Sequence, residues 1–280
     1  MRNFSVSKSV LGSSIELSLT GDLDETELRD ISVKGFEQMH RIEKIMSFHD
    51  EASELSMINR MAHESTVEIS PEMSDVLDLG LRLSTLSDGY YDLTIGACLV
   101  ENELLPKTFD GDRSQSTWRD LVLEGRKLTF NQPAAIDLGG MIKGYLVDVV
   151  ANALGENVDY SVNLEGHQRM RPWAQRNAGI RVPDPDYFIS LECPMQESAV
   201  ATSAPCFHDG TNPIFCPYSR EPVRASHSVS VFAESCMLAD ALTKVAFLAP
   251  LAKEIMREIN AVAIVIDDQG GITPFEDYAR

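Results

Sequence analysis

Apolar residues recur at helical spacing in several stretches of the chain. The acidic turn GDLDET leads into a long stretch of this kind, and a second begins at Pro71 and ends at Asp88 and Gly89. The same spacing predicts helices over 141–154, 237–248 and 251–259, and a short helix within SELSMIN. The apolar face of the first helix comprises Leu28, Ile31, Phe36, Met39, Ile42 and Ile45. We expect this face to pack against a core.

Alternating apolar and polar positions predict strands in other segments. They cover 14–20, 160–164, 180–182, 188–192, 199–203, 228–232 and 261–266, and a hairpin with Gly125 at its bend covers 121–130. The stretch 205–223, rich in proline and polar residues, is typical of a loop. Because helices and strands are interleaved without regular alternation, we expect an α+β fold rather than a doubly wound sheet.

Length and charge narrow the class of protein. The chain has 280 residues, enough for a sizeable core, and since no repeat or composition shift marks a linker, residues 1–280 are expected to form one domain. Its net charge of -19 argues against nucleic acid and against an anionic membrane surface as partners. A phosphate ligand would need local compensation by helix ends, lysines or a divalent cation.

The cysteines and the apolar segments indicate the cellular compartment of the protein. The five cysteines are scattered and odd in number, without a CxxC pair, so neither a disulfide framework nor a structural zinc site is expected. They are Cys98, Cys193, Cys206, Cys216 and Cys236. The first residues lack the apolar core of a signal peptide, and no segment reaches the about 18 apolar residues of a membrane span. These features predict a cytoplasmic protein without membrane insertion.

One motif suggests a binding site for phosphate. In AIDLGGMIKGYLVD, residues 135–148, an apolar run ends in Asp137 and the pair Gly139 and Gly140, and a helix carrying Lys143 follows directly. Glycines let a ligand approach the backbone, a helix start offers unpaired N–H groups, and the lysine adds a positive charge. An ordinary strand-to-helix turn is the alternative interpretation.

Four ordered segments resemble a known family. They are SELSMIN (53–59), SDGYYDLTIG (87–96), IDLGGMIKGYLVD (136–148) and CMLADALTKVAFL (236–248), and they resemble motifs of the ApbE family, the FAD:protein FMN transferases. The resemblance implies a single unit of two intertwined lobes, with mixed or antiparallel sheets, packed helices and an FAD cleft between the lobes. It also implies an enzyme that splits FAD and attaches the FMN half, through a phosphoester, to a threonine of a partner flavoprotein, using a divalent ion, usually Mg²⁺.

The resemblance assigns roles to individual residues. FAD contacts are implied for Tyr90, Tyr91, Asp92, Asp137 and Lys143, and also for Leu11, His49 and Ile214, which stand where the family has its MGT, a tyrosine and its HIIDPRTG segment. The implied metal ligands are the Gly140 carbonyl and Asp240, with Thr243 beside it. Asp137 and Asp240, the latter through a metal-bound water, are the candidate general bases. The GGD turn of the family is Glu165, Gly166 and His167 here.

The last motif departs from the family at the position of its metal-binding threonine, which is Lys244 here. Asp240 and Lys244 are four residues apart and are expected to lie on one helix face, where they could pair. One hypothesis is that the ammonium takes the place of the metal, and another is that Thr243 is a shifted ligand. A solvated surface pair is the third interpretation.

Three functions remain open at this stage: an FMN transferase, a non-catalytic FAD-binding relative for storage, delivery or sensing, and a hydrolase that splits FAD with water. His49, His167 and His227 are interpreted as packed or surface histidines, because they lack ligand spacing. The sequence leaves the acceptor protein and the oligomeric state open.

Overall fold

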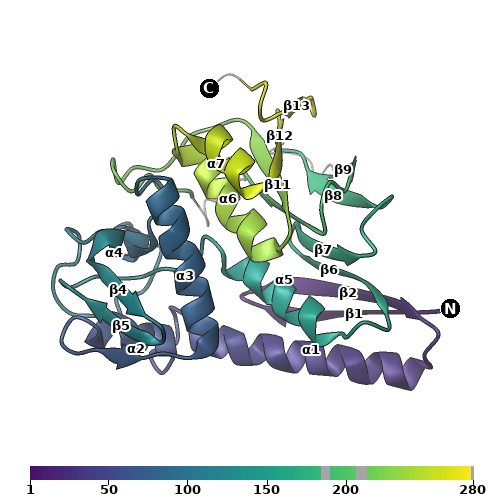
Figure 1. Cartoon of the computed structure of the whole chain (residues 1–280), viewed down its shortest axis with the longest axis horizontal. Helices are drawn as coiled ribbons and strands as arrows, with labels where there is room; N and C mark the ends of the chain where they lie inside the picture. Colours follow the sequence, from purple (N-terminus) through teal and green to yellow (C-terminus); the bar gives the residue numbers. More distant parts are fainter. Residues whose placement is uncertain (184–189, 206–212, 279–280) are drawn as a thin grey trace.

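A large antiparallel sheet runs through the molecule (Figure 1). The computed structural model describes residues 1–183, 190–205 and 213–278. The strands lie in the order β1-β2-β6-β7-β10-β11-β12-β13. Their bounds are β1 Arg2–Val10, β2 Ser13–Gly21, β6 Asp159–Leu164, β7 His167–Arg171, β10 Ala199–Ser203, β11 Ser228–Ala233, β12 Val262–Ile266 and β13 Ile272–Pro274.

The first hairpin brings the N-terminal segment onto the sheet. β1 pairs with β2 along its whole length, and the turn between them places Leu11 and Gly12 at positive φ. The strand prediction for 14–20 is confirmed by β2, whereas β1 was not predicted. It is an edge strand in which Phe4, Val6 and Val10 face the core and alternate with exposed polar residues, mostly serines, and the alternation is interrupted at Lys8.

Three helices cover one face of this sheet. α1 (Glu25–Met46) begins at a capping box, in which Asp24 and Glu27 each bond the backbone of the other, and runs along β1 and β2. α5 (Ile142–Ala153) and α6 (Cys236–Leu248) lie beside it and confirm the helices expected there. α7 (Ala252–Ile259) follows α6 and precedes β12. The main core lies between these helices and the sheet.

A smaller lobe stands at one end of the large sheet, at the left in Figure 1. It contains a three-stranded sheet in the order β3-β5-β4, with Gly125 at the expected bend between β4 and β5. Its strands are β3 Val67–Glu68, β4 Leu121–Glu124 and β5 Lys127–Phe130, and its helical segments are α2 Glu54–Met61, α3 Pro71–Leu86, η1 Leu93–Ile95, α4 Gly96–Glu101 and η2 Trp118–Asp120. The aromatic turn YYDLTIG leads into η1.

A second small core lies on the other face of the large sheet. The hairpin of β8 (Asn177–Arg181) and β9 (Ser190–Pro194) packs there on β7, β10 and β11 through Met170, Val200 and Phe232. β9 overlaps the strand expected over 188–192, whose first two residues lie outside the described ranges. Part of the expected loop over 205–223, including Cys206, also lies outside them.

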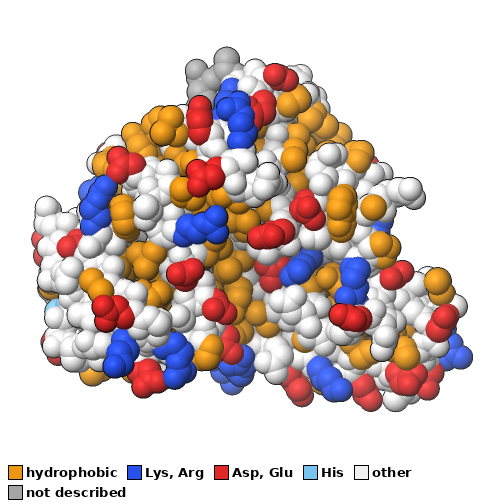
Figure 2. Space-filling view, viewed as in Figure 1, with side chains coloured by type: hydrophobic (Ala, Val, Ile, Leu, Met, Phe, Trp, Pro, Cys, Tyr) orange, Lys and Arg blue, Asp and Glu red, His pale blue; other side chains and the backbone are white. Residues whose placement is uncertain are grey.

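The architecture confirms the α+β prediction, and the pairings between the described strands are antiparallel. Acidic and basic side chains alternate over the face drawn in Figure 2. Cys98, Cys193, Cys216 and Cys236 are free thiols. Among the described residues, no helix combines the length and apolarity that a membrane crossing requires.

Candidate functional site

The segment before α5 is clamped by a buried asparagine. Asn59 is fully buried on α2, and its side chain accepts from Ile136 N at 2.8 Å and donates to Ile136 O at 2.9 Å. Asp137 N donates to Leu93 O at 2.9 Å. Asn59 thus orders a segment 77 residues away. The backbone at Ile136 and Asp137 is thereby fixed to α2 and η1 of the smaller lobe.

The glycine pair after Asp137 makes room for two site residues. Gly139 N donates to Asp137 Oδ2 at 2.9 Å, and a Cβ on Gly139 would lie only 2.9 Å from the same oxygen. A Cβ on Gly140 would come within 3.3 Å of the Tyr91 hydroxyl. The glycine pair therefore lets the Asp137 carboxylate and the Tyr91 phenol approach the backbone. The motif predicted such an approach for a ligand.

Asp137 has the pKa of a potential general base. Burial raises the pKa of its carboxyl to about 6, against the opposing effects of the Gly139 amide and of the positive charge of His49. Lys244 also lies within electrostatic range of Asp137. The sequence placed Asp137 and His49 in the FAD site, and the structure brings them together.

Three residues of the aromatic turn, Tyr90, Tyr91 and Asp92, have different surroundings. Tyr91 is buried, and burial together with the nearby charges of Asp240 and Asp137 raises the pKa of its phenol, which therefore stays neutral. Tyr90 instead packs against Tyr218, with the two rings tilted and their centroids 4.8 Å apart. Asp92 caps η1 by accepting from Thr94 N at 2.8 Å. The FAD contacts expected of Tyr90 and Asp92 stay predictions.

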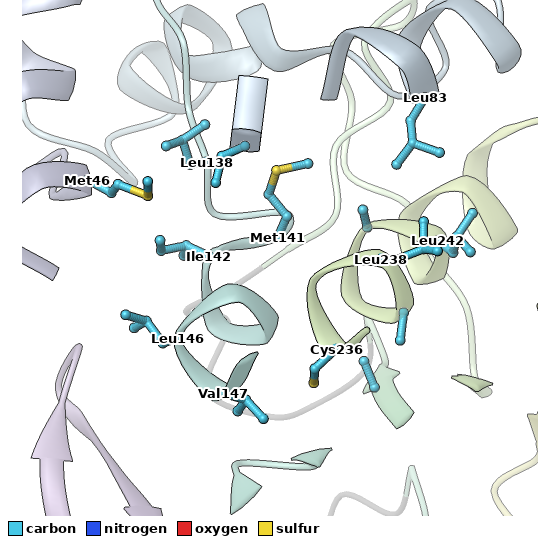
Figure 3. Packing of buried hydrophobic residues seen from close by; sticks show 14 of the residues in the cluster. Met46, Leu83, Leu138, Met141, Ile142, Leu146, Val147, Cys236, Leu238 and Leu242 are labelled. Atoms are coloured by element: carbon cyan, nitrogen blue, oxygen red, sulfur yellow. The ribbon is translucent and has the colours of Figure 1, made fainter. Parts of the chain in front are cut away.

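α5 and α6 lie side by side, with buried hydrophobic side chains packed around them (Figure 3), and hydrogen bonds join the two helices. A Cβ on Gly144 would lie 2.2 Å from Cys236 O, so only glycine permits this approach. Asp148 of α5 accepts from Cys236 N at 3.0 Å and from Met237 N at 2.8 Å, at the start of α6. Asp240 of α6 accepts in return from Gly144 N at 3.1 Å, in the first turn of α5.

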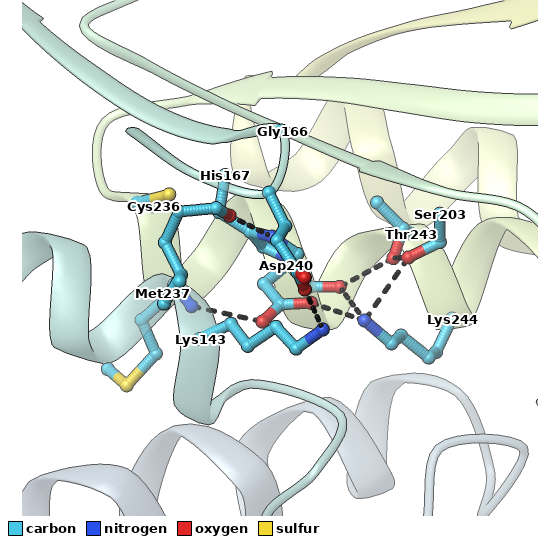
Figure 4. Close-up of polar contacts among 12 residues, drawn as sticks. Lys143, Gly166, His167, Ser203, Cys236, Met237, Asp240, Thr243 and Lys244 are labelled. Atoms are coloured by element: carbon cyan, nitrogen blue, oxygen red, sulfur yellow. Dashed lines mark hydrogen bonds and ion pairs between the residues drawn. The ribbon is translucent and has the colours of Figure 1, made fainter. Parts of the chain in front are cut away.

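Asp240 is the centre of a buried cluster of charges (Figure 4). It is 1% exposed, and its Oδ1 contacts Lys244 Nζ and lies 3.2 Å from His167 Nε2. Burial alone would raise the pKa of this carboxyl, but the charges of His167 and Lys244 outweigh it and hold the pKa well below its usual range. The expected pairing of Asp240 with Lys244 is confirmed, and the solvated-pair interpretation is wrong.

His167 belongs to this cluster, which the sequence did not indicate. Its side chain is buried at the start of β7, where Nδ1 contacts Leu164 O at 3.0 Å and Nε2 faces Asp240. The interpretation as a packed histidine is correct for its burial but missed the ion pair. The one available signal was its place in the segment where the family has GGD.

Lys143 reaches across to the β6–β7 turn. Its Nζ donates to Glu165 Oε2 at 2.9 Å, and in Figure 4 the amino ends of Lys143 and Lys244 point toward one another from opposite sides. Burial would raise the pKa of Glu165, but hydrogen bonds from Ser13 and Lys143 lower it. Ser13 directly follows the turn of the first hairpin, and Leu11 N in that turn donates to Glu43 Oε1 at 2.9 Å. The MGT-like segment thus lies near Lys143.

Two further expectations concern Ile214 and the start of α5. Ile214 is buried, and its carbonyl accepts from Val223 N at 2.7 Å within the segment 213–223. The amide of Ile142 donates to Leu138 O and that of Gly144 to Asp240, so these first-turn amides are satisfied within the chain. The positive end of α5 therefore meets the carboxylate of Asp240.

The oxygens expected to bind Mg²⁺ do not fit such an ion in this arrangement. Both oxygens of Asp240 have partners, and Thr243 Oγ1 contacts Asp240 O and Ser203 Oγ at 2.7 Å each. Mg²⁺ requires near-octahedral oxygen ligands at about 2.1 Å, a position in which the Lys244 ammonium would collide with it. Among the described residues no group of three His, Cys, Asp or Glu side chains could hold a metal ion. The predicted metal roles of Gly140, Asp240 and Thr243 remain untested.

Comparisons with known proteins give a consistent result. The FAD:protein FMN transferase of Vibrio cholerae is 26% identical over 266 residues, covering 84% of this chain and 78% of that protein. The enzyme of the same name from Chlamydia pneumoniae is 31% identical over 153 residues. The match covers 48% of this chain and about half (49%) of the Chlamydia pneumoniae enzyme. The crystal structure of the ApbE protein of Thermotoga maritima superposes with a TM-score of 0.78 at 23% identity, covering 98% of this chain and 97% of that one.

The match to the family itself extends over most of the sequence. The sequence model of the ApbE family matches residues 11–266, from the turn of the first hairpin to the end of β12. This range includes the Asp137 segment, the aromatic turn and the Asp240 cluster. The chain therefore belongs to the ApbE family.

Proposed function

We propose that this chain is a flavin transferase, which moves FMN from FAD to a threonine side chain of a partner flavoprotein and joins the two by a phosphoester bond. The observation that carries the proposal is that Asp137, a carboxylate with a pKa of about 6, lies within electrostatic range of the Lys244 ammonium, toward which Lys143 also points in Figure 4. A base and fixed positive charges are what phosphoryl transfer from a pyrophosphate requires.

The proposed reaction replaces the phosphoanhydride bond of FAD by a phosphate ester of threonine. The threonine Oγ forms a bond to the phosphorus of the FMN half, while the bond from that phosphorus to the bridging oxygen breaks. AMP leaves with the electron pair of the broken bond. The hydroxyl proton passes to Asp137, which is largely ionised at neutral pH because its pKa is about 6.

The other site residues supply positive charge, a hydrogen-bond donor and support for the backbone beside Asp137. Lys143 and Lys244 are held by Glu165 and Asp240, so their ammonium groups are positioned before substrate arrives. Such preorganised charges stabilise the negative charge that develops on the leaving phosphate. The neutral Tyr91 hydroxyl beside Gly140 keeps a hydrogen to donate to a phosphate oxygen. Asn59 acts on Asp137 only through the backbone of Ile136.

Product analysis tests the proposal. The protein is incubated with FAD and a threonine peptide taken from a flavoprotein, with and without Mg²⁺, and the products are identified by mass spectrometry. We expect the peptide to gain the mass of FMN, with release of AMP. A matched peptide with valine in place of threonine, which has the same shape without the hydroxyl, is expected to stay unmodified.

Two other results would replace this proposal. AMP and free FMN without a modified peptide would identify a hydrolase that uses water as acceptor. Bound, unchanged FAD would identify a binding protein, the candidate favoured by the contact of Lys244 with Asp240, which occupies the expected metal ligand.

A further inference from the structure

Lys244 lies in a pocket of oxygen atoms. Its Nζ contacts Asp240 Oδ1, lies 3.1 Å from Asp240 O, and lies 3.3 Å from Ser203 Oγ. A carboxylate, a carbonyl and a hydroxyl are the ligand types that hard cations prefer in proteins. The side chain is only 17% exposed, so the ammonium is held within the protein rather than in solvent.

The surroundings keep the ammonium in place. Ser203 Oγ is also bonded to Thr243 Oγ1 at 2.7 Å, and that hydroxyl donates to Asp240 O at 2.7 Å. The contacts with Asp240 and Thr243 lie within α6, and Ser203 comes from the end of β10. Because all the oxygens around Nζ are linked to one another, displacing the ammonium would disturb the whole network.

His167 makes a second contact with the same carboxylate. Its Nδ1 contacts Leu164 O at 3.0 Å, and its Nε2 lies 3.2 Å from Asp240 Oδ1. The carboxylate that holds the Lys244 ammonium is therefore fixed on two sides, by Lys244 from its own helix and by His167 from β7.

We propose that Lys244, held by Asp240 and Ser203 and supported by His167, is a resident cation in the place of a divalent metal ion, so that this chain handles the phosphates of its substrate without one. The catalytic consequence of this inference rests on the proposed function. That the Lys244 ammonium fills a cation site does not depend on the proposed function. The ammonium has the role of stabilising charge on the leaving phosphate, as a metal ion would.

Metal binding and product formation together test the inference. Mn²⁺, which shares the oxygen preference of Mg²⁺, is titrated into the wild type and Lys244→Thr and followed by electron paramagnetic resonance. We expect saturable micromolar binding only in Lys244→Thr, with loss of that binding in the double variant with Asp240→Asn. Lys34→Thr, which removes an exposed lysine of α1, is the matched control and should behave as the wild type.

Activity supplies the second readout. Wild-type flavinylation in EDTA is expected to stay within about twofold of its rate in millimolar Mg²⁺. Lys244→Thr should lose at least about tenfold in EDTA and regain most of it with Mg²⁺. Wild-type transfer that EDTA abolishes and Mg²⁺ restores would overturn the inference, as would micromolar Mn²⁺ binding by the wild type that Asp240→Asn removes.

Further measurements keep the two proposals separable. If the wild type transfers no flavin under any condition, the proposed function fails, and the Mn²⁺ titration still decides whether the cation site is filled. If Lys244→Thr does not fold, Lys244→Gln retains a hydrogen-bond donor of similar length without the charge. The transfer rate of Lys244→Gln should fall about tenfold with or without Mg²⁺. If Lys244 had only a structural role, Lys244→Gln would transfer flavin at nearly the wild-type rate.

Discussion

The two aspartates of the site illustrate how neighbours decide what a carboxylate can do. Asp137 and Asp240 both lie within electrostatic range of the Tyr91 phenol. Burial raises the pKa of Asp137 to about 6, because its principal hydrogen bond comes from the neutral Gly139 amide. At Asp240 the charges of His167 and Lys244 outweigh burial, so its pKa falls well below the ordinary range.

The difference separates a reactive group from a structural one. A carboxylate with a pKa near neutrality exchanges a proton readily, whereas one held between two cations stays ionised. Asp137 is accordingly suited to accept a proton, and Asp240 to anchor positive charge. Substitutions at the two positions should therefore affect different properties of the protein.

The largest expected effect is on stability, at Asp240. Asp240→Ala leaves the buried Lys244 and His167 without their carboxylate and Gly144 N without an acceptor. We expect the free energy of unfolding to fall by about 3–5 kcal/mol. Urea denaturation at neutral pH measures this loss. Asp137→Ala serves as the comparison, and an equal loss in both variants would contradict the division of roles.

Asp137 should dominate the rate of transfer. Asp137→Asn retains an oxygen to accept from Gly139 N but cannot take up the threonine proton at neutral pH. We expect kcat for flavinylation to fall about a hundredfold with little change in KM for FAD. Steady-state assays at several FAD concentrations check this. A kcat close to that of the wild type would exclude Asp137 as the base.

The pH dependence of the reaction should report the same group. Below a pH of about 6 the carboxyl of Asp137 is protonated, so the rate should fall about tenfold per pH unit. Above that value it should level off, because the base is already ionised. Rates of the wild type and of Asp137→Asn are compared across this range. A variant profile with the same acidic limb would assign the limb to another residue.

The smallest energetic effect is a gain in stability at Asp137. The folded pKa of about 6 lies above the unfolded value of about 4, so between these values the folded state binds more protons. Stability therefore falls as the pH rises through this window, and the penalty is fully present above it. Asp137→Asn should be up to about 2–3 kcal/mol more stable than the wild type at neutral pH, since one pKa unit corresponds to about 1.4 kcal/mol. Thermal unfolding should show the gain disappearing near pH 4.

Local sequence patterns predicted most of the helices and one of the two ion pairs of Asp240, the pair with Lys244. The periodicities behind α1, α5 and α6 are strong because one face of each packs on the sheet. Lys244 was placed beside Asp240 because residues four apart on a helix are neighbours. This reasoning needs no knowledge of the rest of the fold.

Contacts between distant segments were beyond such reasoning. His167 reaches Asp240 only because β7 pairs with β10 beneath α6, and the sequence of β7 did not indicate a strand. Asn59 clamps Ile136 across 77 residues of chain. Neither contact follows from spacing, since each joins segments that are brought together only by the tertiary fold. The resemblance identified the motifs, but not what the departures from them contact.

The reciprocal bonding of α5 and α6 has a mechanical consequence. Three hydrogen bonds cross this seam, from Gly144 N to Asp240 and from Cys236 N and Met237 N to Asp148, where Gly144 brings the helices into contact. Separating α5 from α6 would break all three hydrogen bonds at once, so the two helices move as one rigid unit. Any hinge that admits a substrate must lie elsewhere, and spin labels on the exposed ends of α5 and α6 should keep their separation when FAD binds.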